Sequence, residues 1–171
     1  MGNQNDDKYI ISYEEIMNRS VADVLIQLSS LKGKALSSLT LRDLSYAEGR
    51  YIFPGHGVYL FRKGTEIVYV GKVRNMSFVE RIPKHFDLRH AGWFNRLLKL
   101  ICTKELQLKS TDEHIMKAHD YAFSHLNIVL IHFEYHNRVD RIERLLRSCT
   151  SALNSFKSVR LKNYNTLLNE Y

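Results

Sequence analysis

The stretch from residue 57 to residue 71 constrains the fold more than any other part of the chain. Two runs rich in β-branched and aromatic side chains, residues 58–62 and 66–71, flank the turn sequence Lys63-Gly64-Thr65. A short turn that contains glycine, set between two such runs, predicts a β-hairpin. The hairpin fixes two antiparallel strands around which the remaining elements have to be placed.

Helical spacing marks the first fifty residues. Ser12 can cap a helix, and apolar residues then recur every three or four positions over residues 21–31. Lys32-Gly33 ends this run, and leucines within residues 39–44 indicate another short helix. Residues 1–50 are therefore predicted to form a helical N-terminal extension that serves as a scaffold or lid.

Beyond the hairpin the sequence predicts three further helices and one strand. The helices cover residues 78–86, 93–101 and 138–149, and the strand covers residues 127–133. Pro83 has to lie in the first turn of its helix or bend it. Trp93 opens the apolar stripe of the next helix, and the strand is apolar enough to be central in a sheet.

Together these elements predict an α/β (α+β) domain over residues 51–171. Its small central sheet would have three strands, antiparallel or mixed, with helices flanking it. The long stretch over residues 86–120 is interpreted as an insertion, and the chain from residue 155 onward as a basic, polar tail. Cys102 and Cys149 lie among leucines and isoleucines without metal-ligand spacing, so we expect both to pack in the core.

Charge narrows the classes of partner. The formal net charge is +7 and the isoelectric point is about 9.4, which favours a polyanion because lysines and arginines release counterions from phosphates. No apolar run approaches the roughly 20 residues of a membrane span, so no membrane partner is expected. The N-terminus is acidic and polar, unlike a secretory signal, and we expect a cytoplasmic protein.

Tyrosine, arginine and histidine gather near the hairpin in a combination suited to a phosphodiester. The strands carry the triplets Gly57-Val58-Tyr59 and Tyr69-Val70-Gly71, which are followed by Lys72, Arg81 and His85. Further on come Glu143-Arg144-Leu145-Leu146 and Leu153-Asn154. This ordered set resembles the GIY-YIG nuclease family, and the resemblance spans residues 57–154.

The resemblance implies a set of functional residues. The implied catalytic residues are Tyr59, Tyr69, Lys72, Arg81, His85 and Glu143, with Gly57, Gly71 and Asn154 supporting the site. Tyr59 would orient or deprotonate the attacking water, and Lys72 would supply positive charge to lower the phenol's pKa. Tyr69 would contact the phosphate, and Asn154 would brace the site by hydrogen bonds.

Three further roles follow from the same resemblance. Glu143 is the implied ligand of a divalent cation, Mg²⁺ or Mn²⁺, which suits hard oxygen ligands. Arg81 is suited to clamp a phosphate with its planar guanidinium. His85 lies one helical turn after Arg81 and would donate to the phosphate or position the nucleophile.

Each of these side chains also has an ordinary structural interpretation. Tyr59 and Tyr69 can be packed strand residues, because tyrosine is common in β-sheets. Arg81 can form a surface ion pair with Glu80 or Glu134, a single histidine is often structural, and Glu143 lies in a charged helical cluster. The residues alone leave these alternatives open.

The chain departs from the family pattern at three places. Ser151 stands where the family has proline, and the interval from Gly71 to Arg81 is longer than in compact members. The insertion over residues 86–120 is the third departure, and a target-reading surface can be built on it. Lysines of this part of the chain would contact a nucleic-acid backbone or solvate a surface.

The implied activity is a metal-dependent endonuclease acting on DNA, with RNA as a further candidate substrate. A free-standing chain of this size resembles restriction or phage-defence members of the family. Cutting both strands would require a homodimer, since one site cleaves one strand. Two alternatives remain: an inactive nucleic-acid-binding protein, and a nuclease subunit that docks into a larger complex through residues 1–50.

Overall fold

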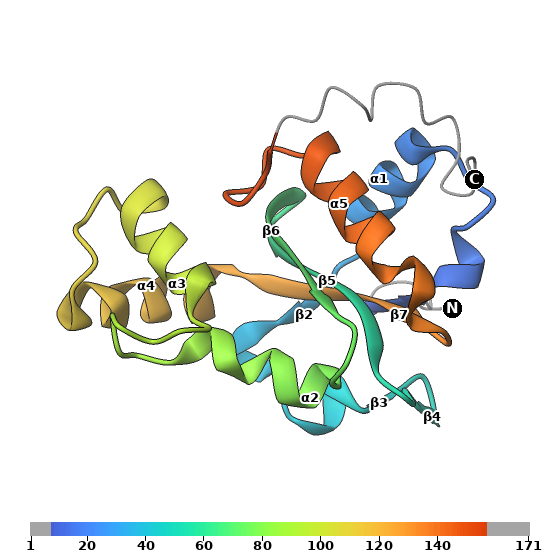
Figure 1. Ribbon diagram of the computed structural model, residues 1–171, viewed down its shortest axis with the longest axis horizontal. Helices are drawn as coiled ribbons and strands as arrows, with labels where there is room; N and C mark the ends of the chain where they lie inside the picture. Colours follow the sequence, from blue (N-terminus) through green and yellow to red (C-terminus); the bar gives the residue numbers. More distant parts are fainter. Residues whose placement is uncertain (1–7, 157–171) are drawn as a thin grey trace, which may run out of the picture.

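A computed structural model describes residues 8–156, which form a mixed α/β structure around one five-stranded sheet (Figure 1). β5 (His56–Lys63) and β6 (Glu66–Val73) form the predicted hairpin, and β5 pairs on its other side with β7 (Asn127–Phe133). Both pairings are antiparallel, so the predicted three-stranded core is present with its strand at residues 127–133.

The N-terminal part differs from the prediction of a purely helical extension. β1 (Ile10–Ser12) pairs parallel to β7, and β2 (Lys34–Ala35) pairs antiparallel to it, so this part completes the sheet. The helix α1 (Val21–Ser30) is present between them. Strands this short carry too few residues to show a period of two, and the unpaired edge of β7 dictates their pairing.

The second short helix predicted over residues 39–44 is also replaced. The structure has single 3₁₀ turns at Leu36–Ser38 and Arg42–Leu44, followed by a two-stranded sheet of β3 (Tyr46–Ala47) and β4 (Arg50–Tyr51). Another 3₁₀ turn, Tyr13–Glu15, stands where the first helix was expected to open. Ser12 is the N-cap of this turn and forms a capping box with Glu15, whose Oε1 accepts from the Ser12 backbone N–H at 2.9 Å.

Three of the remaining helices follow the predicted order: α2 (Phe78–Arg81) with a 3₁₀ turn at Pro83–Phe86, α3 (Arg96–Leu100) with a π turn at Ile101–Glu105, and α5 (Val139–Cys149) after the 3₁₀ turn His136–Arg138. A fourth helix, α4 (Asp112–His125), was not predicted from the sequence. Pro83 begins its 3₁₀ turn, where a missing N–H costs nothing. Trp93 was expected within a helical stripe, but it precedes α3 and is 87% exposed.

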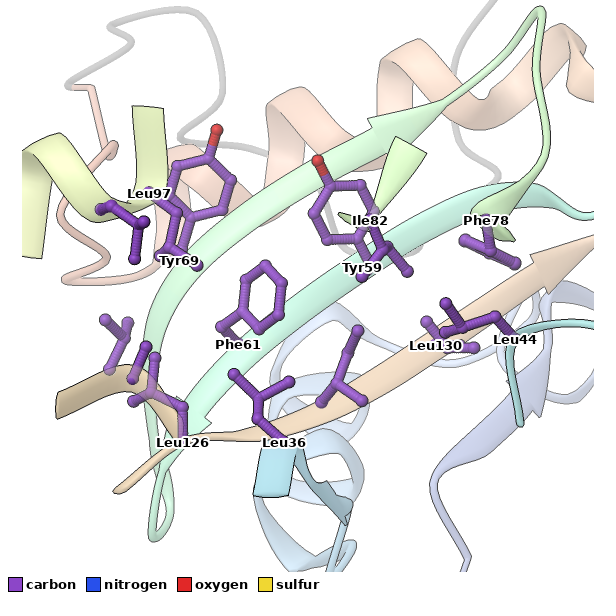
Figure 2. Close-up of a cluster of buried hydrophobic side chains, with 14 of the residues drawn as sticks. Leu36, Leu44, Tyr59, Phe61, Tyr69, Phe78, Ile82, Leu97, Leu126 and Leu130 are labelled. Atoms are coloured by element: carbon purple, nitrogen blue, oxygen red, sulfur yellow. The ribbon is translucent and has the colours of Figure 1, made fainter. Parts of the chain in front are cut away.

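Side chains that alternate along β5 and β6 divide the core into two layers. Tyr59, Phe61 and Tyr69 face the layer under α2, α3 and α4, which Figure 2 shows in close-up. Val58 and Val70 face the opposite layer, which α1 and α5 cover. This division decides which elements can contribute side chains to a site on each face.

The two cysteines differ in their exposure. Cys102 is buried as expected, but Cys149 is exposed, because it is the last residue of α5. Within residues 8–156, no helix combines the length and the apolar character that a membrane crossing requires. Of the basic tail predicted from residue 155 onward, residues 157–171 lie outside the described part of the chain.

A buried arginine joins α1 to the hairpin. Arg62, at the end of β5, is only 2% exposed, although it carries a permanent charge. Its guanidinium donates to the carbonyls of Leu28 at 2.7 Å, Ser29 at 2.9 Å, Leu31 at 2.6 Å and Gly64 at 2.6 Å. The last carbonyls of a helix have no partner within it, so this side chain satisfies the C-terminal end of α1.

We expect Arg62→Met to lower the free energy of unfolding by about 2–4 kcal/mol, because it leaves buried carbonyls without donors. Arg62→Lys should lose less, since one ammonium can still reach part of the set. Urea denaturation followed by circular dichroism measures both. The matched control is Arg19→Met, at an exposed arginine before α1, and an equal loss in that variant would contradict the interpretation.

Candidate active site

Two tyrosines from neighbouring strands bring their hydroxyls to one edge of the sheet. Tyr59 on β5 is fully buried and Tyr69 on β6 is 4% exposed, and their rings stack with centroids 6.5 Å apart. Figure 2 shows the two phenol oxygens pointing the same way, across β6. Because β6 is the last strand of the sheet on this side, the oxygens approach an edge and not the middle of a layer.

Glycine at two positions makes this geometry feasible. Tyr59 pairs with Gly71 across the hairpin, and a Cβ at Gly71 would lie 2.2 Å from Cζ of the Tyr59 ring. A Cβ at Gly57 would lie 2.0 Å from the carbonyl oxygen of Ile131 on β7. Both glycines therefore support the site by permitting close approach, in one case of a ring and in the other of a backbone.

His85 lies against both phenols. It sits in the 3₁₀ turn after α2, is fully buried, and its Nε2 is 2.5 Å from the Tyr59 hydroxyl oxygen. Burial, assisted by the charge of Arg81, lowers the pKa of His85 to about 3, so the imidazole is neutral at physiological pH. Its Nδ1 is buried without a hydrogen-bond partner among the described residues.

The phenols are also held neutral. Burial raises the pKa of Tyr59 and of Tyr69, and the nearby Arg81 guanidinium opposes the rise in both. Lys72 was expected to lower the Tyr59 pKa. The pKa is raised instead, and Arg81 is the main opposing charge.

Arg81 ends α2 and is the cation nearest to these rings. Its Nη1 is buried and has no hydrogen-bond partner in residues 8–156, and Cζ lies 5.4 Å from the centroid of the Phe94 ring. The alternative of an ion pair with Glu80 is not what the structure has, because the Glu80 carboxylate accepts from Ser77, the N-cap of α2. A buried guanidinium nitrogen without an acceptor is suited to receive an anion.

Glu143 reaches the same edge from the other face of the sheet. It lies on α5, is 7% exposed, and raises the pKa of both phenols by its negative charge. Its Oε1 accepts from Arg147 Nη1 at 3.0 Å, and Oε2 lies 3.6 Å from Lys72 Nζ. The polar groups therefore meet around the edge of β6, from α2 on one side and α5 on the other.

Lys72 belongs to the α5 side of this arrangement. The ammonium is 2.7 Å from Asp140, one turn before Glu143 on α5, and Arg74 also pairs with Asp140 at 2.8 Å. These pairs lower the pKa of Asp140. The carboxylates of Asp140 and Glu143 therefore both face cations. Lys72 thus orients the acidic side of the site, apart from the phenol that it was expected to activate.

Asn154 braces β6 by the hydrogen bonds expected of it. Its Nδ2 donates to the carbonyl of Val70 at 2.6 Å, and its Oδ1 accepts from the N–H of the same residue at 3.1 Å. The N–H of Leu153 donates to the carbonyl of Val68 at 2.7 Å. The chain after α5 therefore covers the edge of β6 up to Val70, and the polar cluster begins next to that point.

Sequence reasoning missed Arg147, which connects the two supports of the site. Besides pairing with Glu143, its Nε donates to the carbonyl of Asn154 at 2.9 Å. Its charge also opposes the rise of the Tyr69 pKa. The signal was its position four residues after Glu143, the spacing at which a helix places an acid and a base on one face.

Glu143 is the residue that would hold a divalent cation at this edge, with few other protein ligands. No group of three or more histidine, cysteine or acidic residues in the described chain forms a closed metal site. Glu143 nevertheless offers a nearly buried carboxylate whose Oε2 faces only the Lys72 ammonium among the described residues. Magnesium commonly uses one or two carboxylates and completes its shell with waters and phosphate oxygens, and this arrangement suits it.

A cavity lies elsewhere in the described structure and has the wrong charge for a phosphodiester. This cavity of about 440 Å³ is lined by β1, the β3–β4 hairpin and the end of β7. Its walls carry the carboxylates of Glu14, Glu15, Glu48 and Glu134 and the cation of Arg50. Like charges would repel a phosphate there, so we place the candidate site at the β6 edge.

The comparisons with known proteins add no relative. No family model, no curated protein and no solved structure matches this chain. The chemistry of the β6 edge therefore has to be inferred from its geometry, which combines the Arg81 guanidinium, a phenol–imidazole pair and a carboxylate.

We expect the buried imidazole to make stability fall in weak acid. The unfolded chain gains a proton on His85 below about pH 6.5, whereas the folded chain resists it down to about pH 3, so stability decreases as pH falls through this window. The slope from one such group reaches about 1.4 kcal/mol per pH unit. Urea midpoints across this range should fall less steeply for His85→Gln than for the wild type.

The control for this titration is His125→Gln, at an exposed histidine at the end of α4. That variant should keep the wild-type dependence on pH. Equal slopes for the His85 variant and the wild type would show that the imidazole titrates normally in the folded state.

The contact between Gly71 and Tyr59 predicts coupled mutations. Gly71→Ala should cost about 1–3 kcal/mol, because the added methyl group overlaps the Tyr59 ring. Tyr59→Leu removes the ring atoms in the way, so the double variant should be more stable than the sum of the single losses allows. Denaturant unfolding of the four proteins measures the coupling, and additive losses would contradict the packing described.

Proposed function

We propose that this chain is a divalent-metal-dependent endonuclease of the GIY-YIG type that hydrolyses DNA phosphodiester bonds. The observation that carries the proposal is the hydrogen-bonded pair of Tyr59 and His85 beside the unpartnered Nη1 of Arg81. A proton-accepting pair next to a vacant anion donor is what attack of water on a phosphate requires. The ordered sequence motifs supply the second support.

Arg81 binds the phosphate in this proposal. Its guanidinium is always charged and donates several hydrogen bonds in one plane, which suits two oxygens of the same phosphate. The neighbouring phenol of Tyr69 is neutral, because burial raises its pKa, and it can donate to a third oxygen. These donors are held by packing, so little reorganisation is needed when negative charge develops.

Tyr59 and His85 move the proton of the attacking water. The water gives its proton to the hydroxyl oxygen of Tyr59 as the phenol proton passes to Nε2 of His85, which leaves a hydroxide, a neutral phenol and an imidazolium. In the free protein burial, assisted by the charge of Arg81, lowers the His85 pKa and opposes this transfer. A phosphate bound to Arg81 offsets that charge, so the pair becomes a better base when substrate is present.

Glu143 supplies the acidic side of the site. A divalent cation bound there would neutralise charge on the phosphate and on the departing 3′ oxygen. Glu143 now faces Arg147 and Lys72, and both are long side chains that can turn toward backbone phosphates when a cation takes their place. Asp140 keeps the Lys72 ammonium on this side of β6.

The net charge of +7 supports a nucleic-acid substrate, and DNA is the proposed one. We extend the proposal to a free-standing nuclease of restriction or phage-defence type that acts as a homodimer when both strands are cut. Assays with RNA of the same sequence and measurement of oligomeric state decide these two extensions.

The test is nicking of supercoiled plasmid with Mg²⁺ or Mn²⁺. We expect activity in the wild type and losses of about 100-fold or more in Tyr59→Phe and Glu143→Gln, because each removes a group that acts in the transition state. Glu113→Gln is the matched control, since Glu113 lies on α4 and pairs only with Lys117 among the described residues. Circular dichroism verifies that each variant is folded.

The outcomes separate the alternatives. Cleavage that survives Glu143→Gln, or that needs no divalent cation, would overturn the assignment of this carboxylate. DNA binding without cleavage in the wild type would favour an inactive nucleic-acid-binding protein.

A further inference from the structure

The only tryptophan of the chain is displayed to solvent. Trp93 is 87% exposed and lies just before α3, outside the apolar stripe that Leu97, Leu98 and Ile101 bury. Within residues 8–156 it stacks on no aromatic ring and receives no cation. An indole is the largest apolar side chain, so its exposure leaves a broad aromatic face open to a partner.

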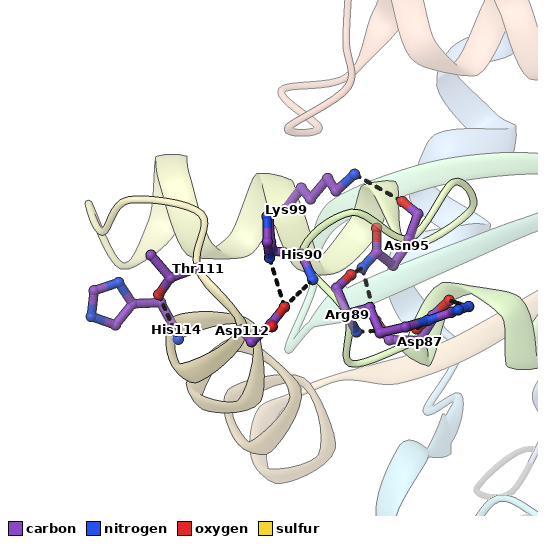
Figure 3. A network of polar contacts seen from close by, with 9 residues as sticks. Asp87, Arg89, His90, Asn95, Lys99, Thr111, Asp112 and His114 are labelled. Atoms are coloured by element: carbon purple, nitrogen blue, oxygen red, sulfur yellow. Dashed lines mark hydrogen bonds and ion pairs between the residues drawn. The ribbon is translucent and has the colours of Figure 1, made fainter.

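The segment that carries Trp93 is held rigidly. Figure 3 shows Asn95 Nδ2 donating to the carbonyls of Asp87 at 2.8 Å and Arg89 at 2.6 Å, while Lys99 Nζ donates to the carbonyl of Gly92 at 2.8 Å. Asn95 is fully buried. The loop over residues 87–95 is thus tied down on both sides of the indole, which lowers the entropy lost when the indole binds a partner.

A second set of hydrogen bonds ties this loop to α4. The backbone N–H and Nδ1 of His90 lie 2.6 Å and 2.7 Å from Oδ1 of Asp112, the first residue of α4 (Figure 3). Thr111 in turn caps α4 by accepting from the N–H of His114. The helix therefore serves as a fixed base for the loop.

The loop lies beside the candidate active site. The ring of Phe94, adjacent to Trp93 in the chain, has Arg81 Cζ at 5.4 Å and Lys84 Nζ at 5.2 Å from its centroid. The charge of Arg96, two residues further on, opposes the rise of the Tyr69 pKa. The indole is therefore adjacent in the chain to a ring that contacts Arg81.

The charge around the indole favours a polyanion over an apolar protein surface. Residues 81–99 contain five lysines or arginines and one acidic residue, Asp87, which Arg89 already pairs. Lys84 and Arg96 form no ion pair within residues 8–156. Aromatic side chains that alternate with cations are typical of surfaces that bind single strands, where bases stack and phosphates pair.

We infer that Trp93 stacks on an unpaired base next to the phosphate held by Arg81, so that the substrate is a nucleic acid with a single-stranded or distorted segment at the cleavage point. This inference rests on the proposed function and specifies its substrate class. A base inside a regular duplex has both faces covered by its neighbours, whereas an unpaired base offers a face to the indole.

The test uses Trp93 as its own reporter in the full-length protein without divalent metal. Titration with an unlabelled single-stranded DNA oligonucleotide should quench the tryptophan fluorescence, and the same sequence as a blunt duplex should quench it less. Fluorescence anisotropy of labelled oligonucleotides gives the affinities. We expect Trp93→Ala to weaken single-strand binding by about fivefold to 100-fold, and Trp93→Phe to restore most of the affinity.

The matched control is Tyr51→Ala, at a 78% exposed aromatic residue on β4, at the other end of the molecule from α3 in Figure 1. Its affinity should equal that of the wild type. Absence of binding, binding without a change of fluorescence, or equal affinity in Trp93→Ala would each overturn the inference. So would fluorescence that changes with protein concentration alone, since it would indicate contact between two copies.

Failure of this inference is distinguishable from failure of the nuclease proposal. Binding is measured without metal, so it does not depend on cleavage. Quenching that depends on Trp93 in a protein without nuclease activity would refute the activity and leave the stacking intact. Cleavage that is insensitive to Trp93→Ala, with unchanged fluorescence, would refute the stacking alone.

Discussion

The close approach of the Tyr59 ring to the backbone of Gly71 is the contact on which the candidate site depends. Because Gly71 has no Cβ, a phenol that starts on β5 can lie across the neighbouring strand and bring its oxygen to the edge of the sheet. Any side chain at Gly71 would hold the ring back in the layer under α2. His85 can pair with Tyr59 only in the position that this contact permits.

The electrostatics of the site differ on its two sides. On the side of α2, burial keeps Tyr59 and His85 neutral, and Nη1 of Arg81 has no hydrogen-bond partner among residues 8–156. On the side of α5, Glu143 is balanced by Lys72 and Arg147. The first side is thus suited to receive an anion, and the second can exchange its own cations for a metal ion.

The sequence predicts well those parts whose periodicity is long enough to read. The hairpin, the strand at residues 127–133 and α5 are found where hydrophobic spacing places them. The motif residues on these elements also meet in space, although α5 lies on the opposite face of the sheet from the phenols. The glycine triplets carry much of this information, because a steric requirement at one residue can be read without a structure.

Other features depend on contacts that local sequence does not contain. β1 and β2 have three and two residues, and they form because β7 leaves an edge to pair with. Arg62 is buried because α1, some thirty residues earlier, presents its last carbonyls to it. Trp93 fits a helical stripe by spacing, yet the helix begins after it, so its exposure follows from the loop that Asn95 fastens.

The partly covered edge of β6 also affects whether copies of this protein can associate by pairing their strands. Among the described residues, Leu153 and Asn154 protect the edge only as far as Val70, and the rest of the strand would be a template for strand addition by another molecule. Lys72 lies on this part of β6 and Arg74 directly follows the strand, and charged side chains at a strand edge discourage intermolecular β-sheet growth. Lys72, which pairs with Asp140 and Glu143 on α5, thus also disfavours aggregation through this strand edge.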